Sequence, residues 1–244
     1  MILPYAMEYC LWIQEEIYMG QVEQVRIEDL FTLQETIAKE YLEQFTYPWE
    51  ALGGIHDYIL ELGAALPEEL YDHPAPDVWI AKSARVFSSA YLGGACIIGE
   101  HTEVRHCAFI RGDALVGDCC VVGNSVELKN VILFNHCEVP HYNYVGDSIL
   151  GFHAHMGAGS ITSNIKSDRK NIVVKGEQQY ETGRRKIGAI LGDYVEVGCN
   201  AVLNPGTIIG KRSMIYPTTC VRGVIKSDTI VRDNGTRIAK VSDI

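Results

Sequence analysis

The stretch Ile80–Phe134, IAKSARVFSSAYLGGACIIGEHTEVRHCAFIRGDALVGDCCVVGNSVELKNVILF, has an aliphatic or aromatic residue at every sixth position. The series comprises Ile80, Val86, Leu92, Ile98, Val104, Ile110, Val116, Val122, Leu128 and Phe134. A second, mostly small series follows each of the first nine by four residues: Ala84, Ala90, Cys96, Thr102, Ala108, Ala114, Cys120, Val126 and Ile132. This period fits neither an amphipathic helix nor an ordinary alternating strand. We therefore expect both series to point into one core.

Short parallel strands joined by tight turns account for this period. With three strands in each coil, 18 residues return the chain to the same face, one strand spacing of about 4.8 Å further along the axis. The sequence therefore predicts a mainly β fold, a three-sided parallel β-helix in which residues 18 apart are stacked neighbours.

The pattern continues less regularly through Val145, Leu150 and Met156, and it resumes with the series Leu191, Val197, Leu203, Ile209, Ile215 and Val221. An insertion at about residues 164–187 separates the two parts, and insertions in solenoids form loops at one edge. This one holds seven basic and three acidic residues, a net charge of +4. We expect either a cationic, phosphate-binding arm or a solvated flexible loop.

Residues 1–75 lack the period and are predicted to form a helical N-terminal region, followed by the solenoid over 76–244. A capping box at Thr32–Glu35 predicts a helix with an apolar face, and Pro48 suits the first position of a second helix. The tract Leu66–Pro76, with three prolines, is expected to be a linker. The helices are expected to pack on the solenoid or on a partner subunit.

The net charge of −10 argues against a nucleic acid or an anionic membrane surface as a partner. In the first 20 residues, glutamates interrupt the apolar run and no basic end precedes it, so we expect neither a signal peptide nor a spanning helix. A cytoplasmic location is the expectation. Cys119 and Cys137 lie 18 apart and should stack, which raises the question of a disulfide, although a reducing cytosol disfavours one.

Arg111 and Lys129 are also 18 apart, each directly after an inward position, so they should lie side by side on the outer surface. Two like charges in that arrangement are destabilising unless an anion such as phosphate neutralises them. The alternative is that both side chains extend away from each other into solvent. His141 lies two periods of six beyond Lys129, where the pattern falters. A histidine there is a candidate general base, and the alternative is an inert surface side chain.

Three segments carry a resemblance to a known family: Gly123–Lys129, Pro140–Asp147 and Met156–Asn164. Together they resemble the acetyltransferase domain of the bifunctional uridyltransferase that makes UDP-N-acetylglucosamine. The segment Gly183–Gly188 looks still more like the archaeal sugar-phosphate nucleotidylyltransferase/acetyltransferase enzymes. This resemblance implies a left-handed β-helix, an assembly of three copies with sites between subunits, and acetyl-CoA as the acetyl donor.

The resemblance also implies roles for particular residues. His141 would be the general base that takes a proton from the amine of an amino sugar 1-phosphate, Glu127 would orient it, and the backbone N–H of Ala158 would stabilise the oxyanion. Arg111 and Lys129 would hold the phosphate. The expected sugar contacts are Tyr144 and Asn164, and the expected coenzyme contacts are Cys199, Tyr216, Pro217, Arg184, Arg185 and Lys186.

Two departures from the family pattern concern the ligands. The family's asparagine in the sugar pocket falls on His155, and its serine and small residues at the coenzyme fall on Cys199, Tyr216 and Pro217. In addition, residues 1–75 contain no glycine-rich nucleotide loop, so we expect no uridyltransfer.

Two alternatives stay open. The first is a carbonic anhydrase-like metalloenzyme, since Arg111-Gly112-Asp113 resembles its Arg-Gly-Asp segment and His136 and His141 have the spacing of two zinc ligands. Its other histidines are not found at the expected spacing, because only His153 and His155 follow. The second is a non-catalytic solenoid partner of a separate sugar nucleotidyltransferase, with the helical N-terminal region as the docking part.

Overall fold

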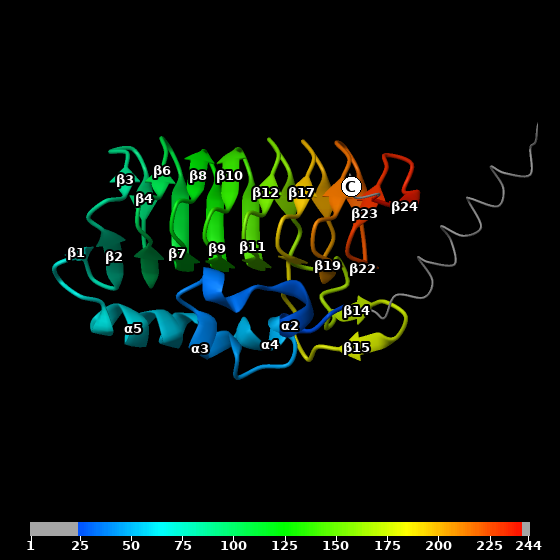
Figure 1. Ribbon diagram of the computed structural model, residues 1–244, viewed down its shortest axis with the longest axis horizontal. Coiled ribbons are helices and arrows are strands. Elements are labelled where there is room, and N and C mark those ends of the chain that lie inside the picture. The colour runs from blue at the N-terminus through cyan, green and yellow to red at the C-terminus, as the bar shows by residue number, and fades with distance from the viewer. Residues whose placement is uncertain (1–23, 241–244) are drawn as a thin grey trace, which may run out of the picture.

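The computed structural model describes residues 24–240, so the expectation for the first 20 residues lies outside the described part. A row of short parallel strands forms a long solenoid, and helices lie along one side of it (Figure 1). The helical segments are α2 (Ile27–Leu30), η1 (Leu33–Glu35), α3 (Lys39–Leu42), α4 (Pro48–Ala51) and α5 (Ile55–Ala65). The predicted mainly β solenoid with an N-terminal helical part is confirmed.

The solenoid has three faces. The first face consists of β2 (Val78–Ala81), β5 (Cys96–Ile98), the second halves of β7 (Phe109–Val116), β9 (Glu127–Leu133) and β11 (Tyr144–Leu150), and β16 (Ala189–Leu191), β19 (Thr207–Ile209) and β22 (Val224–Ile225). The second face consists of β3 (Arg85–Val86), β6 (Glu103–Val104), β8 (Val121–Asn124), β10 (Glu138–His141), β12 (His155–Met156), β17 (Glu196–Val197), β20 (Met214–Ile215) and β23 (Thr229–Val231). The third face consists of β4 (Tyr91–Leu92), the first halves of β7, β9 and β11, and β13 (Ile161–Thr162), β18 (Val202–Leu203) and β21 (Cys220–Val221).

Two antiparallel strands close the sheets. β1 (Tyr71–Ala75) pairs with β2, and β24 (Arg237–Ala239) pairs with β23. The expectation that Leu66–Pro76 is only a linker was therefore wrong for its second half.

The predicted inward series is confirmed through most of its length. Every member from Ile98 to Leu128 is at most 1% exposed, and so are the small residues from Cys96 to Val126. Residues with positive φ recur six apart at the turns, as at His101, Cys107 and Asp113, whose φ values are 56°, 60° and 54°. This left-handed conformation turns the chain sharply from one face to the next.

The coil becomes one residue shorter at β9. Ile110 pairs with Leu128, but Gly112 pairs with Lys129 and Ala114 with Val131, so one corner has lost a residue. Val131 takes the inward position, and Ile132 pairs with Leu115 in the outer row. The predictions that Ile132 and Phe134 point inward were therefore wrong. Phe134 packs instead against Phe31, with ring centroids 4.9 Å apart.

The same shortening explains the cysteines. Val121 pairs with Glu138, one position earlier than a full coil would give, so Cys137 lies beside Cys120 rather than beside Cys119. Cys137 is buried, Cys119 is exposed, and both are free thiols. The predicted stacking of Cys119 on Cys137 was wrong.

The outer row of the first face is hydrophobic along its whole length. It comprises Trp79, Ile97, Leu115, Ile132, Ile149, Ile190, Ile208 and Val224, none of which is more than 9% exposed. Much of this row lies beneath the N-terminal helices, which pack on their own solenoid (Figure 1). A Cβ at Gly63 of α5 would lie 2.4 Å from the ring of Trp79, so the contact there is close.

The helices themselves are shorter than expected. The capping box predicted at Thr32 was wrong, because the N–H and hydroxyl of Thr32 both donate to Asp193, each at 2.8 Å, and only η1 follows. The start at Pro48 is confirmed, but α4 ends at Ala51 and α5 begins separately after Gly54.

Truncation of the Ile132 side chain should show how much the packing of the helices on the solenoid contributes to stability. Ile132→Ala should lower the free energy of unfolding by about 2–5 kcal/mol, because it leaves a cavity between two packed layers. The measurement is urea unfolding followed by circular dichroism. Tyr142→Ala, at a side chain that is 64% exposed, is the control, and equal losses in the two variants would contradict this packing.

Candidate functional site

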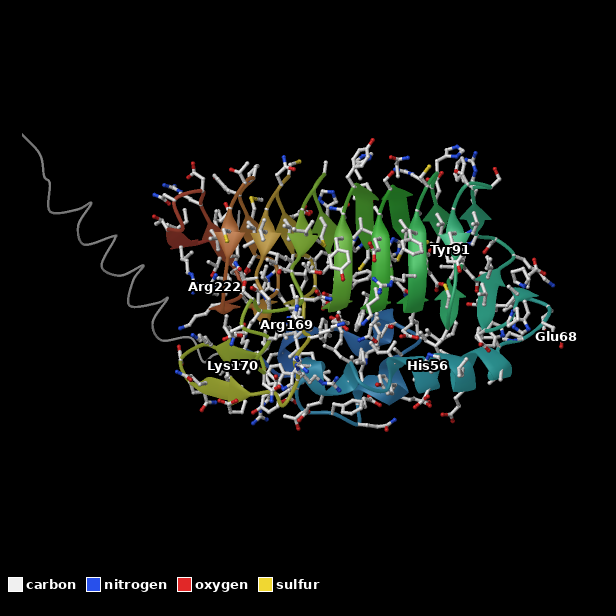
Figure 2. The ribbon with its side chains drawn as sticks, turned by 180° about the vertical axis from the view of Figure 1, so that it is seen from behind. His56, Glu68, Tyr91, Arg169, Lys170 and Arg222 are labelled. Carbon is white, nitrogen blue, oxygen red and sulfur yellow. The ribbon has the colours of Figure 1, made fainter. Side chains whose placement is uncertain are left out.

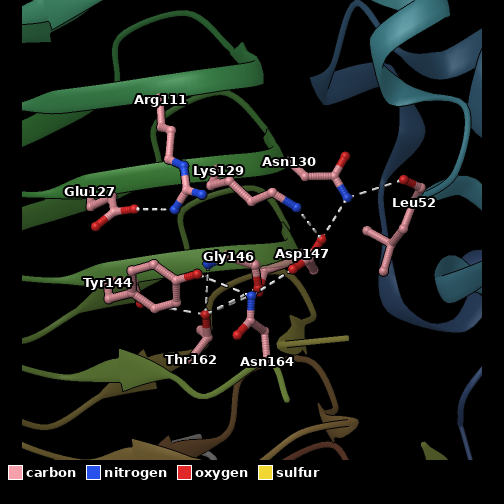
Figure 3. A network of polar contacts seen from close by, with 11 residues as sticks. Leu52, Arg111, Glu127, Lys129, Asn130, Tyr144, Gly146, Asp147, Thr162 and Asn164 are labelled. Carbon is pink, nitrogen blue, oxygen red and sulfur yellow. Dashed lines mark hydrogen bonds and ion pairs between the residues drawn. The ribbon is translucent and has the colours of Figure 1, made fainter. Parts of the chain in front are cut away.

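Polar side chains gather where the third face turns into the first (Figure 3). Arg111, Glu127 and Lys129 extend from β7 and β9, and Tyr144 extends from β11. Asn164 follows β13 at the next coil. The structure therefore brings together the residues that were predicted to bind the phosphate and the sugar.

The cations at this corner already have acidic partners. Arg111 Nη1 lies 3.2 Å from Glu127 Oε1, and Lys129 Nζ lies 2.9 Å from Asp147 Oδ1. Each of the two cations therefore has an acidic side chain of the fold as its partner. Arg111 lies at the register shift between Ile110 and Gly112, and its side chain is 56% exposed, so most of its N–H groups stay available.

Asp147 is the centre of this network, and the sequence analysis did not find it. Its carboxylate, 4% exposed, accepts from Lys129, from Asn130 Nδ2 at 2.9 Å and from Asn164 Nδ2 at 2.6 Å. The sequence contains a signal that could have identified it. At this corner three residues separate the two inward positions of β7, whereas only Gly146 and Asp147 separate those of β11. Its φ of 49° makes the tightened turn.

Tyr144 and Asn164 form the next part of the network. Asn164 Nδ2 donates to Tyr144 Oη at 3.0 Å. Burial, followed by the charge of Asp147, raises the pKa of Tyr144, so its hydroxyl keeps its proton at neutral pH. A neutral hydroxyl can both donate to and accept from a sugar hydroxyl.

The N-terminal helices touch this corner directly. Asn130 Nδ2 donates to the carbonyl of Leu52 at 3.1 Å, and His56 Nδ1 lies 2.7 Å from Asp113 Oδ1. The hydrogen bond to Asp113 raises the pKa of His56. The segment between α4 and α5 is therefore part of the wall of the site.

The corner between the second and third faces carries the predicted base and several of the residues predicted to contact the coenzyme. Backbone hydrogen bonds of 2.8–2.9 Å run from Gly159 N to His141 O, from Asn200 N to Ala158 O and from Thr218 N to Cys199 O. His141, Ala158 and Cys199 therefore follow one another along this edge, and Tyr216 and Pro217 come next to Cys199 on the following coil.

His141 is exposed, and its side chain forms no hydrogen bond with any other described residue. Its main-chain N–H donates to Asn143 Oδ1, and the buried Asn143 amide donates in turn to the carbonyl of Gly157 at 2.8 Å. Glu127, predicted to orient His141, pairs with Arg111 instead. The neighbouring N–H of Ala158 donates to no group within residues 24–240, so it is free to bind a ligand oxygen.

The basic insertion is an ordered hairpin of β14 (Val173–Lys175) and β15 (Gln179–Glu181) with buried Ile172 and Val174. Tyr180 packs on Tyr47 and Trp49 of the helical region, with centroids 5.5 and 5.8 Å apart. The structure thus favours neither a projecting arm nor a loose loop.

The three basic residues predicted to bind the coenzyme lie in this hairpin and its return to the solenoid. Arg184 Nη2 donates to the carbonyl of Glu50 at 3.2 Å, and Arg185 Nε donates to that of Arg169 at 3.1 Å. The main chain of Lys186 pairs with that of Ile165 in an isolated antiparallel β-bridge. The structure does not bring Arg184 to the edge that holds Cys199.

The two histidines proposed as zinc ligands lie at different corners. His136 follows the first face and stacks on His153, with centroids 4.7 Å apart, whereas His141 precedes the third face. Within the described range, no three His, Cys, Asp or Glu side chains form a grouping that suits a metal ion. No helix in that range is long and apolar enough to cross a membrane.

The parallel coils, the inward aliphatic rows and the corner site define a hexapeptide-repeat β-solenoid. Residues 92–214, half of the chain, match the family model described as the GMPPB C-terminal domain. The chain belongs to this family.

Curated relatives include bifunctional proteins. The bifunctional protein GlmU of Methanococcus maripaludis strain C5 is 34% identical over 124 residues, which cover 51% of this chain and 30% of that protein. The bifunctional sugar-1-phosphate nucleotidylyltransferase/acetyltransferase of Sulfurisphaera tokodaii is 34% identical over 146 residues, which cover 59% of this chain and 36% of that protein. The chain thus spans about a third of the length of these relatives, and it resembles their β-solenoid acetyltransferase part.

The solved structures that match the chain share less sequence with it. WeeI from Acinetobacter baumannii AYE is 16% identical with a TM-score of 0.35, covering 75% of this chain and 67% of that chain. The acetyltransferase domain of PglB from Neisseria gonorrhoeae FA1090, in complex with acetyl coenzyme A, is 16% identical with a TM-score of 0.28, covering 72% and 60%. At these TM-scores, neither likeness bears on the site.

Loss of the Asp147 carboxylate should weaken the whole corner. Asp147→Ala should lower the free energy of unfolding by about 2–3 kcal/mol, since hydrogen bonds to a charged group contribute about 1.5–3 kcal/mol and Lys129 would lose its counter-charge. Urea unfolding measures the change. Asp168→Ala, which removes an exposed carboxylate from a surface ion pair, is the control. A loss no greater than in that control would contradict a central role for Asp147.

His155 provides a pH-dependent contact. Its Nδ1 lies 2.8 Å from Glu196 Oε2, and this hydrogen bond raises the pKa of His155 above its ordinary value of 6.5. A raised folded-state pKa means that the pair stabilises the fold fully below the unfolded pKa and loses that contribution as the pH rises through the folded pKa. In NMR titrations, the His155 ring should titrate above pH 6.5, and Glu196→Gln should lower its pKa. An unchanged pKa in that variant would contradict the assignment.

Proposed function

We propose that the chain is an acetyl-CoA-dependent N-acetyltransferase whose acceptor is an amino sugar 1-phosphate of the glucosamine or galactosamine type. The observation that carries the proposal is the adjacency of an exposed imidazole and an unused backbone N–H on one edge, His141 beside Ala158. A network of polar side chains lies at the other edge of the third face (Figure 3).

His141 is the group that takes the proton. Its neutral imidazole removes a proton from the acceptor amine as the nitrogen attacks the thioester carbonyl. The Ala158 N–H stabilises the oxyanion that forms on that carbonyl. When the tetrahedral intermediate collapses, the C–S bond breaks and the imidazolium returns its proton to the departing thiolate. The products are an amide and a free thiol, which together account for every atom of the amine and the thioester.

The opposite edge suits the acceptor. The exposed guanidinium of Arg111 has N–H groups to spare for a phosphate, and Lys129 adds charge at the same corner. Tyr144 lies one coil beyond Lys129 and Asn164 one coil beyond Tyr144, and they present a hydroxyl and an amide to the sugar. Acetyl-CoA supplies the acetyl group, and Cys199, Tyr216 and Pro217 would flank it on the edge beyond Ala158. A homotrimer with sites between subunits belongs to the same proposal.

A second candidate is a non-catalytic solenoid partner of a sugar nucleotidyltransferase. The observation in its favour is that Glu127 and Asp147 already neutralise Arg111 and Lys129, so the fold does not require a bound phosphate at this corner.

A thiol-release assay separates the two candidates. The purified chain is given acetyl-CoA with a panel of amino sugar 1-phosphates and nucleotide-linked amino sugars. His141→Ala should lower kcat by at least about 10²-fold, the usual contribution of a positioned general base. His153→Ala, an exposed histidine at another corner, should leave the rate unchanged. Light scattering should give the same oligomeric mass for all three proteins. Absence of thiol release with every acceptor, or an unimpaired His141→Ala variant, would overturn the acetyltransferase proposal.

A further inference from the structure

A hollow of about 620 Å³ lies between the insertion and the solenoid, at the corner between the third and first faces. One wall is the chain leading into β14, and the opposite wall is formed by the turns Asn204–Gly206 and Arg222–Gly223. Its volume lies within the range of about 300–1,000 Å³ that small-molecule sites occupy. None of the residues proposed to act in acetyl transfer is among those that line it.

Two glycines set the shape of this hollow. Gly206 and Gly223 both have a φ of 77°. A Cβ at Gly206 would lie 2.6 Å from Ile172, and one at Gly223 would lie 2.5 Å from the carbonyl of Lys175. The hairpin therefore packs directly against two turns of the solenoid, at positions where only glycine fits.

The lining has an apolar part and a cationic part. Ile165 is 43% exposed, and it lines the hollow together with Ile172 and Pro205. Apolar side chains in the lining of a hollow are typical of sites that bind rings, and Ile165 presents such a side chain here. Ser163 and Asn204 add hydrogen-bonding groups beside it.

Three cations complete the lining, against one carboxylate. Lys166 pairs with Asp168 at 3.2 Å, and Arg222 Nη2 donates to Asn204 Oδ1 at 3.2 Å. Lys175 makes no side-chain hydrogen bond or ion pair with another residue of the described chain. In a protein of net charge −10, this local excess attracts anions. Arg169, Lys170 and Arg222 lie on the same side of the molecule, around the hairpin (Figure 2).

We propose that this hollow binds a nucleoside diphosphate group, with the phosphates on Lys175 and Arg222 and the base on the Ile165 wall. A lone phosphate would leave the apolar wall unused, and a purely apolar ligand would leave Lys175 and Arg222 without an anionic partner. Coenzyme A and nucleotide sugars both carry a nucleoside diphosphate, and competition distinguishes these two sources. The proposal does not depend on His141, because no residue of the His141 edge lines the hollow.

The test is isothermal titration of ADP, UDP and GDP into the full chain at low salt. At least one should bind with one site per chain and a Kd below about 1 mM, weakening as salt is added. Lys175→Gln/Arg222→Gln should weaken binding at least tenfold, and Ile165→Glu, which places an acidic group on the wall, should weaken it similarly. Arg85→Gln/Arg105→Gln, which neutralises two partly or fully exposed cations of the second face, is the matched control and should bind as the unaltered chain does.

Competition then identifies the source. Displacement by coenzyme A alone assigns the site to the coenzyme, and displacement by a nucleotide sugar alone assigns it to a sugar nucleotide. His141→Ala should bind the diphosphate unchanged, so failure of the acetyltransferase proposal and failure of this one are distinguishable. Absence of binding for all three diphosphates, or equal affinity in the Lys175→Gln/Arg222→Gln variant, overturns the proposal.

Discussion

A single buried carboxylate joins three parts of this molecule. Asp147 accepts hydrogen bonds from Lys129, Asn130 and Asn164, at 2.9, 2.9 and 2.6 Å. Asn130 also donates to the carbonyl of Leu52 in the helical region, and Asn164 is the residue at which the insertion departs. A buried charge is tolerated only when it is paired and hydrogen-bonded, so the fold itself requires these neighbours. The site corner therefore has its geometry fixed before a ligand arrives.

The period of six was enough to predict the solenoid, because hydrophobic burial repeats with the coil. From Ile98 to Leu128 the inward residues are where the sequence placed them. The period was not enough at β9, where the corner loses a residue and moves Ile132 and Phe134 out of the inward rows. A deletion of one turn residue leaves no hydrophobic gap, since aliphatic residues at 131, 132 and 133 satisfy both the inward and the outer row. Hydrophobicity alone could not choose between the two registers.

The sequence was sufficient to predict those parts of the candidate site that depend only on which residues of neighbouring coils lie side by side. Residues on neighbouring coils come together whether or not the corner has lost a residue, so Arg111 and Lys129 share a corner as expected. Which partners they have there depends on side-chain directions that a one-dimensional pattern does not contain. Glu127 pairs with Arg111 rather than with His141, and Asp147 was overlooked. The hydrophobic outer row of the first face was visible in the sequence, and it indicates the face on which the helices lie.

The antiparallel strands at the two ends of the described solenoid affect whether copies of the protein associate end to end in concentrated solution. A stack of parallel coils ends in open strand edges, and an open edge is a template for another copy. β1 covers the edge strand β2 at one end, and β24 covers β23 at the other. Coil-on-coil addition of a second molecule is thereby blocked on one sheet at each end, and the fold resists growth into a fibre.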